Sequence, residues 1–194
     1  MEDKIRSFIA LELSLEIRKL LKDLALKYQT TYPNGLRWVR SECIHMTIKF
    51  LGDATITQLE YVAQILERIS QNTSPFRIEI SGIGSFPSWT RPRTIWIGVK
   101  PVTELAALYL QVDEETVKIG FPSEGKRFSP HFTLCRVSND ADPLIISSFT
   151  NELQTIRSRL FGAMIIKRIV LLKSHLQRGG SVYTPISVYP FREQ

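Results

Sequence analysis

The sequence is poor in cysteine and contains no long hydrophobic run. It has two cysteines in 194 residues, Cys43 and Cys135. These are too few for a disulfide scaffold, so we expect free thiols in a reducing compartment. The longest apolar runs fall far short of the ~20 residues that a membrane-spanning helix needs. Charged residues also interrupt the N-terminal segment, where a secretory signal would need an uninterrupted apolar stretch. We therefore expect a cytoplasmic protein with no membrane partner.

Acidic residues are absent from three segments of the chain. None occurs between Glu152 and Glu193, where seven Lys or Arg residues lie, and none occurs within 81–100 or 125–139. The formal net charge is +6 at pH 7. This distribution suits a polyanionic partner such as nucleic acid, but it also suits a solubilising basic surface. Charge alone leaves both alternatives open.

The remaining composition is that of a folded globular protein. Hydrophobic residues make up 43% and charged residues 23% of the chain, which excludes disordered, collagen-like and coiled-coil proteins. A chain of this length buries about 70% of its unfolded surface and is too short for two independent domains. We expect residues 1–194 to form one two-lobed domain that acts as a monomer.

Strand and helix patterns alternate along the chain. The first helix is expected to begin after an N-cap at Ser14. The second is expected to open with a capping box of Thr57 and Glu60, and the fourth with Asp142 before Pro143. Strands are predicted at 6–13, 36–39, 45–51, 76–83, 94–99, 132–137, 161–174 and 181–188, helices at 14–32, 57–69, 103–118 and 142–153, a Pro-rich connection at 86–92 and a turn at Gly179 and Gly180.

The order of these elements predicts an α+β fold. The second half of the chain approximately repeats the first half, so we expect each half to form one lobe. The two pseudo-symmetric lobes would consist mainly of antiparallel sheet, with outer helices around a central cleft.

One tetrapeptide pattern occurs twice. His45-Met46-Thr47-Ile48 and His131-Phe132-Thr133-Leu134 both read His-x-Thr followed by an apolar residue, and each lies in a predicted strand. Successive side chains of a strand point to opposite faces. Each imidazole should therefore share a face with its own threonine hydroxyl, and the two units should meet in the cleft.

Two such units suit displacement at phosphorus. An in-line displacement needs a base on the attacking oxygen, an acid on the leaving oxygen and neutral donors for the other phosphate oxygens. Imidazoles with an ordinary pKa near 6.5 can fill both proton-transfer roles near neutral pH. From the reach of the hydrogen bonds we expect the two rings to lie roughly 6 to 9 Å apart.

The repeated motif resembles that of the two-histidine phosphoesterase superfamily. Within it, the chain is similar to the RNA 2′,3′-cyclic phosphodiesterases, also called the 2′-5′ RNA ligase (LigT/ThpR) family. The matching segments are 6–13, 38–53, 86–99, 127–136 and 171–186.

The resemblance implies a bilobal enzyme without metal or cofactor. Such an enzyme hydrolyses 2′,3′-cyclic phosphate ends of RNA, tRNA fragments among them, to 2′-phosphates, and its reverse reaction joins 2′-5′ ends without ATP. The resemblance also implies the site residues. His45 would be the proton donor to the 3′ oxygen and His131 the proton acceptor from water, while Thr47 and Thr133 would hold phosphate oxygens and Arg136 would neutralise the anion.

Two rival functions remain open at this stage. The chain could be a non-catalytic RNA- or nucleotide-binding module, or a phosphodiesterase that acts on small cyclic nucleotides, because loops and cleft width determine the substrate. A zinc site is a rival chemistry. Strand parity could place Cys43, His45, His131 and Cys135 on one surface, although their spacing differs from that of common zinc fingers.

Several other residues have two interpretations. Arg91 and Arg93, near Trp89 and Trp96, could clamp single-stranded RNA or could be solvated arginines beside core aromatics. We favour core roles for Phe8, Phe132 and Tyr183 over base stacking, a structural role for His175, and a solvated face over a metal site for residues 113–115.

Overall fold

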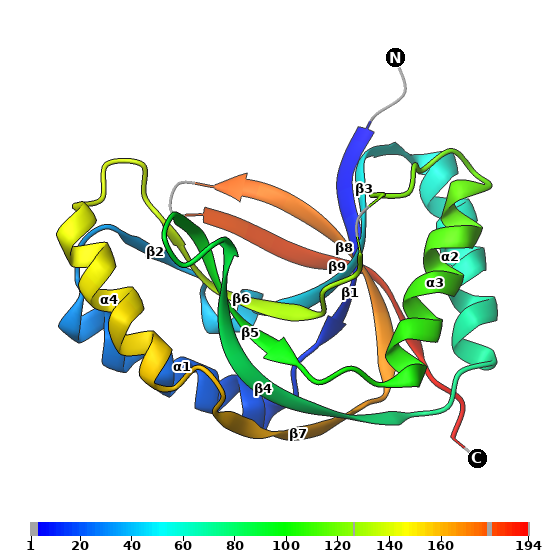
Figure 1. Cartoon of the computed structure of the whole chain (residues 1–194). Coiled ribbons are helices and arrows are strands. Elements are labelled where there is room, and N and C mark those ends of the chain that lie inside the picture. Colours follow the sequence, from blue (N-terminus) through cyan, green and yellow to red (C-terminus); the bar gives the residue numbers. More distant parts are fainter. Residues whose placement is uncertain (1–3, 126, 178–179, 194) are drawn as a thin grey trace.

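The computed structural model describes residues 4–125, 127–177 and 180–193. Within them, two antiparallel sheets stand side by side between two pairs of helices (Figure 1). The strand order is β3-β1-β8-β9 in the four-stranded sheet and β2-β6-β5-β4-β7 in the five-stranded sheet. The strands are β1 (Lys4–Glu12), β2 (Leu36–Trp38), β3 (His45–Thr55), β4 (Phe76–Pro87), β5 (Pro92–Val99), β6 (His131–Val137), β7 (Leu160–Ile166), β8 (Arg168–Gln177) and β9 (Gly180–Pro190). The helices are α1 (Leu15–Thr31), α2 (Ile56–Gln71), α3 (Thr103–Val117) and α4 (Pro143–Thr155), with a short 3-10 turn, η1, at Ser41–Cys43.

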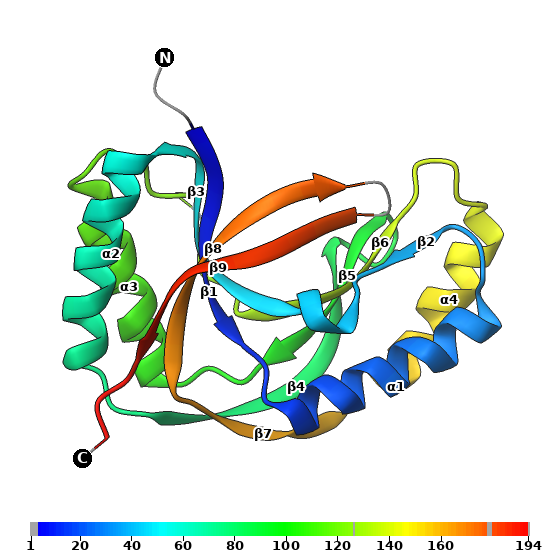
Figure 2. The same ribbon diagram turned by 180° about the vertical axis from the view of Figure 1, so that it is seen from behind.

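Each sheet has its own pair of helices. Helices α2 and α3 lie together against the four-stranded sheet, and α1 and α4 lie together on the side of the five-stranded sheet, as the front and back views both show (Figures 1 and 2). The predicted two-lobed α+β architecture is confirmed. None of the described helices is both long and apolar enough to cross a membrane.

The lobes are not the two halves of the chain, which corrects one expectation. The four-stranded sheet combines β1 and β3 from the beginning of the chain with β8 and β9 from its end, and the middle of the chain supplies most of the other sheet. The prediction failed because similar local patterns in the two halves carry no information on which distant strands pair.

The structure also corrects the strand predicted over 161–174. This segment contains two strands, β7 and β8, which separate at Lys167 and enter different sheets. The run has no turn-forming residue at that point, so the change of sheet leaves no mark in its composition. The predicted connection at 86–92 is also shorter, because β4 continues to Pro87 and β5 begins at Pro92. Gly179 of the predicted turn lies outside the described residues.

Two of the three predicted helix caps are confirmed. The Ser14 hydroxyl accepts a hydrogen bond from the Ile17 amide at 3.3 Å, and the Asp142 carboxylate accepts one from the Leu144 amide at 2.8 Å. The capping box at Thr57 and Glu60 is wrong. It consists instead of Thr55, at the end of β3, and Gln58, which bond each other's backbone amides at 3.2 and 3.0 Å. Both pairs satisfy the capping-box pattern, and the earlier pair lies where the strand ends.

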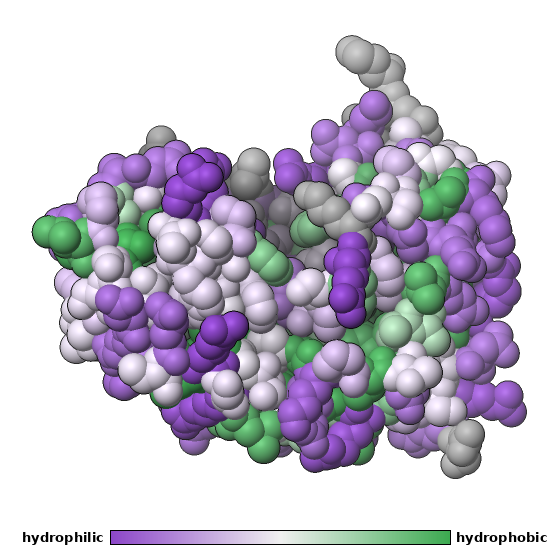
Figure 3. Space-filling model, in the orientation of Figure 1, coloured by the Kyte–Doolittle hydropathy of each residue, from purple (hydrophilic) through white to green (hydrophobic). Residues whose placement is uncertain are grey.

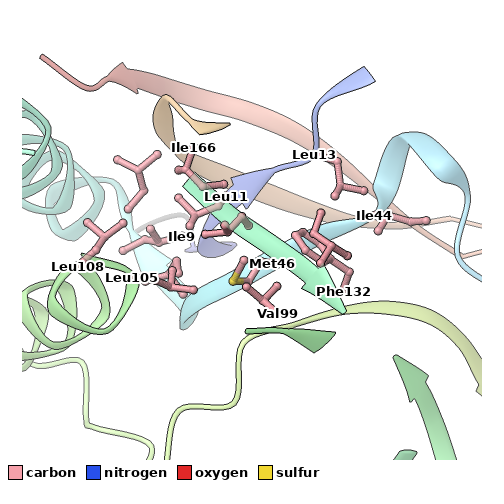
Figure 4. Packing of buried hydrophobic residues seen from close by; sticks show 14 of the residues in the cluster. Ile9, Leu11, Leu13, Ile44, Met46, Val99, Leu105, Leu108, Phe132 and Ile166 are labelled. Atoms are coloured by element: carbon pink, nitrogen blue, oxygen red, sulfur yellow. The ribbon is translucent and has the colours of Figure 1, made fainter. Parts of the chain in front are cut away.

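The main core is shared by both sheets. Figure 4 shows Ile9 and Met46 of the four-stranded sheet with Phe132 of the five-stranded sheet and Leu105 of α3. Ile9, Met46 and Phe132 have no exposed surface. Contact between the sheets through one core fixes β3 relative to β6, and these are the strands that carry the two histidine motifs.

A small second cluster lies on the other face of β1 and β8. It contains Phe8, Ala10, Val170 and Leu172, with Tyr183 of β9 packed against it. Strand alternation separates Phe8 and Ala10 from Ile9, so β1 is buried on both faces. This apolar cluster supports the part of β3 that carries His45.

Candidate active site

The two His-x-Thr motifs lie on neighbouring strands from different sheets. His45 begins β3 and His131 begins β6, and these strands contact each other across the junction of the sheets. A recess separates the two sides of the molecule on the face seen in Figure 3. Each motif histidine and threonine is partly buried, whereas the apolar residues between and after them are buried. The predicted shared face of histidine and threonine is confirmed.

The two imidazoles are held in the same way. His45 Nδ1 lies 2.8 Å from the carbonyl oxygen of Cys43, and His131 Nδ1 lies 2.7 Å from that of Ser129. A carbonyl oxygen only accepts hydrogen bonds, so Nδ1 carries the proton and donates in both rings. Nε2 is left to act as an acceptor in the neutral ring or as a donor in the charged ring. Either ring can therefore exchange a proton with a ligand through Nε2.

Aromatic rings flank both imidazoles. The rings of Phe8 and Tyr183 lie 4.7 and 4.9 Å from His45, measured between centroids. Phe86 and Trp96 lie 5.1 and 5.9 Å from His131 in the same way. These contacts restrict rotation of each imidazole and partly exclude water from it. Of the aromatic residues weighed from the sequence, Phe8 is buried as expected, whereas Tyr183 and Trp96 are half-buried beside the histidines.

The surroundings lower the pKa of both histidines. Burial is the main cause in each ring, and the hydrogen bond from Nδ1 to the carbonyl opposes it. The charge of His131 further lowers the pKa of His45, and the charge of Arg136 further lowers that of His131. The three groups therefore interact electrostatically in one site. An anionic ligand placed among them would favour their charged forms.

A β-bulge in β6 explains the position of Arg136. Thr133 pairs with Trp96 of β5 and Cys135 pairs with the preceding residue of β5, so Leu134 is an extra residue. Leu134 and Cys135 are both buried, and Arg136 is exposed on the side of His131. Strict alternation would have turned Arg136 away from that histidine.

The first motif has a bulge at the equivalent position. Thr47 and Lys49 pair with adjacent residues of β1, which makes Ile48 the extra residue. Ile48 and Lys49 are buried, and Phe50 is 61% exposed. The internal repeat therefore extends beyond the tetrapeptide, with Phe50 at the place that Arg136 occupies in the second motif.

The same bulge argues against the zinc alternative. In a regular strand Cys135 would share a face with His131, because the two residues are four positions apart. The bulge instead turns Cys135 into the core, where it has no exposed surface. Burial also raises the pKa of its thiol, which disfavours the thiolate that zinc binds. Cys43 lies in η1 and its thiol donates to the carbonyl of Ser181 at 3.7 Å. The described residues include no group of three or more His, Cys, Asp or Glu side chains placed to hold a metal ion. Both thiols are free and buried.

Sequence reasoning missed Lys49, whose side chain is only 1% exposed. Its ammonium group pairs with the carboxylate of Asp113 on α3 and donates to the carbonyl of Pro122 at 2.7 Å. Burial raises the pKa of Asp113, but hydrogen bonds from Lys49 and Ser123 outweigh burial and lower it overall. Strict strand alternation would place Lys49 on the face of the histidines, so no signal in the sequence pointed to this pair.

The other candidates are exposed or have structural partners. Arg91 and Arg93 are exposed around the turn between β4 and β5, and His175 is exposed on β8. Glu115 forms ion pairs with Arg68 and Lys118. Residues 113–115 therefore include two carboxylates engaged in ion pairs, where the sequence had favoured a simple solvated face.

The family model described as LigT-like phosphoesterase matches residues 11–96. A relative from Aquifex aeolicus, named RNA 2′,3′-cyclic phosphodiesterase, is 32% identical over 95% of this chain and 96% of its own length. A relative of the same name from Archaeoglobus fulgidus is 32% identical over 95% of this chain and 99% of its own length.

Solved structures share the fold. A protein from Thermus thermophilus superimposes with a TM-score of 0.82 at 24% identity, covering 97% of this chain and 98% of the other. Escherichia coli LigT complexed with 3′-AMP superimposes with a TM-score of 0.76 at 22% identity, covering 98% of this chain and 100% of the other.

Proposed function

The chain belongs to the LigT-like phosphoesterase family, and we propose that it is an RNA 2′,3′-cyclic phosphodiesterase. Two relatives that match almost the whole chain carry that name. The observation that carries the proposal is that the two imidazoles make equivalent hydrogen bonds. Each ring donates through Nδ1 to a backbone carbonyl, which leaves Nε2 for a ligand. The complete pair is supplied by one chain, which supports a single two-lobed domain acting as a monomer.

The proposed reaction is an in-line attack of water on the cyclic phosphate. His131 Nε2 accepts a proton from water as the new P–O bond forms, and His45 Nε2 donates a proton to the 3′ oxygen as the P–O3′ bond breaks. The products are a 2′-phosphomonoester and a free 3′ hydroxyl. We assign the two roles as in the family. Both rings donate through Nδ1 to a backbone carbonyl, so Nε2 of either ring can take part in proton transfer.

Thr47, Thr133 and Arg136 are proposed to stabilise the phosphate. Each threonine shares a face with its histidine, where its hydroxyl can donate to a non-bridging oxygen. Arg136 reaches this side through the bulge and neutralises the charge that increases in the transition state. These side chains provide an acid, a base and positive charge, so we propose that the reaction proceeds without a metal ion or other cofactor.

The same groups can join two RNA ends. A 5′ hydroxyl of a second strand takes the place of water, gives its proton to His131 and forms a P–O5′ bond. His45 again protonates the 3′ oxygen as the P–O3′ bond breaks, which leaves a 2′-5′ phosphodiester. We propose that this ligation is reversible and proceeds without ATP, because one phosphate ester bond replaces another.

The test is hydrolysis of a nucleoside 2′,3′-cyclic phosphate and of a cyclic-phosphate-ended oligonucleotide in EDTA, with identification of the phosphomonoester. We expect a 2′-phosphate, and we expect His45→Ala and His131→Ala each to lower kcat by about 10²- to 10⁴-fold. A 3′-phosphate would instead mean that the 2′ oxygen is the leaving group, and the acid and base roles of the two histidines would have to be exchanged. Binding of RNA that weakens with salt, without any product, would instead support a non-catalytic module.

A further inference from the structure

A cavity of about 760 Å³ adjoins His131 and has no role in the reaction described above. We call it the side pocket. It lies between β4, β5, the segment 127–130 that leads into His131, and residues 157–158 after α4. Its volume falls within the range of roughly 300–1,000 Å³ typical of small-molecule sites. Trp96 in its wall also contacts His131, with 5.9 Å between the ring centroids, so the side pocket lies beside the proposed site of the reacting phosphate.

The side pocket contains a flat aromatic surface. A Cβ atom at Gly84 would overlap the six-membered ring of Trp96, and one at Gly98 would come within 3.2 Å of it. The indole therefore lies close against the glycine backbone of β4 and β5, and Trp96 lines the pocket together with these two glycines. Phe128, also in the wall, is held by a stack with Tyr109 of α3, with 4.1 Å between the ring centroids. Rigid, partly exposed aromatic rings are the surfaces on which nucleic-acid bases stack.

The charge of the side pocket is positive. Arg127 and Arg157 line it from different segments, both are exposed, and neither forms an ion pair with any residue that the structure describes. The described lining includes no aspartate or glutamate. Guanidinium groups bind phosphate in a bidentate way, so this wall favours a phosphodiester over a neutral ligand.

We propose that the side pocket binds the RNA strand on the 5′ side of the cyclic end, with a base on Trp96 and the adjoining phosphodiester at Arg127 and Arg157. This proposal rests on the proposed function and names its substrate as an oligonucleotide. A 2′,3′-cyclic phosphate occupies the last nucleotide, so the strand continues only in the 5′ direction. A nucleoside 2′,3′-cyclic phosphate has no phosphodiester on that side and cannot use the arginines.

The test compares adenosine 2′,3′-cyclic phosphate with a dinucleotide that has the same cyclic end. For the wild-type protein we expect kcat/KM to be at least tenfold higher with the dinucleotide. Arg127→Gln and Arg157→Gln should each lower the dinucleotide value about 5- to 10-fold and leave the nucleoside value unchanged. Arg159→Gln is the matched control, because its guanidinium lies over the ring of Phe161 at 5.4 Å and it does not line the pocket.

Equal losses with both substrates, or no loss with either, would overturn the proposal. Affinities for the two 2′-phosphate products, measured at several salt concentrations, give a readout that needs no turnover. We expect the dinucleotide product to bind more weakly and with a smaller salt dependence in the Arg127 and Arg157 variants. A wild-type protein that hydrolyses neither substrate would refute the proposed function, and the binding measurements would still decide whether the pocket holds the strand.

Discussion

Replacement of Lys49 by methionine should destabilise the protein strongly. The change leaves the Asp113 carboxylate, whose side chain is 14% exposed, without its cationic partner and removes the hydrogen bond to Pro122. Removing one partner of a buried ion pair costs about 3–5 kcal/mol. This is a large fraction of the roughly 5–15 kcal/mol that stabilises an ordinary domain. Urea unfolding at pH 7 should show the midpoint move by a corresponding amount.

Two comparisons identify the cause of that loss. The double variant Lys49→Met, Asp113→Leu should recover most of the stability, because apolar replacement of both buried partners is close to neutral. Lys100→Met, which removes an exposed partner of Glu79, should hardly move the midpoint. A loss below about 1 kcal/mol in Lys49→Met would refute the reasoning.

The pH dependence of this variant has a definite sign. Folding lowers the pKa of Asp113, so its pairing stabilises the wild-type protein above the unfolded-state pKa near 3.9 and is lost as pH falls through the lower folded value. In Lys49→Met the hydrogen bond from Ser123 is the remaining contact that opposes the burial effect, so protonation of Asp113 at low pH costs this variant less stability than it costs the wild-type protein. The difference in stability between the two proteins should therefore shrink below about pH 4.

Three further predictions concern the site and the thiols. Because burial lowers the pKa of both motif histidines, the bell-shaped pH profile of kcat/KM should have its optimum below about pH 6.5. Arg136→Gln removes a charge that lowers the pKa of His131, so it should move the profile to higher pH. An optimum well above pH 7 in the wild-type protein would contradict this reasoning. Thr133→Val, which keeps the shape but removes the hydroxyl, should lower kcat about 10²-fold, and an unchanged kcat would remove this residue from the site. Cys43 and Cys135 should react slowly with a thiol reagent in the folded protein and both react in urea; rapid modification of either thiol before unfolding would show that it is not buried.

Local periodicity was enough to predict the α+β class and the shared faces of the motif residues. His45 and Thr47 lie two positions apart in a strand, and this spacing determines their common face wherever the strand goes. The cap at Ser14 also depends only on neighbouring residues, and it was predicted correctly.

Register between distant strands could not be predicted. The bulges at Ile48 and Leu134 follow from pairing with β1 and β5, and nothing in either motif distinguishes a bulged strand from a regular one. As a result, the burial of Lys49 was missed and the parity argument that grouped Cys135 with the histidines was wrong. The position of Arg136 was supplied by resemblance, and the bulge in β6 now gives its physical reason.

Because both imidazoles donate to backbone carbonyls, their tautomers tolerate substitution of the residues that provide those carbonyls. In many catalytic sites a carboxylate side chain selects the histidine tautomer, and one substitution is enough to lose it. Here main-chain atoms of Cys43 and Ser129 do so, and every amino acid brings the same carbonyl to those two positions. A substitution of Cys43 or Ser129 can therefore replace the thiol or the hydroxyl without changing which nitrogen of the histidine ring is free. Only a shift of the chain path itself would change which nitrogen of each ring carries the proton.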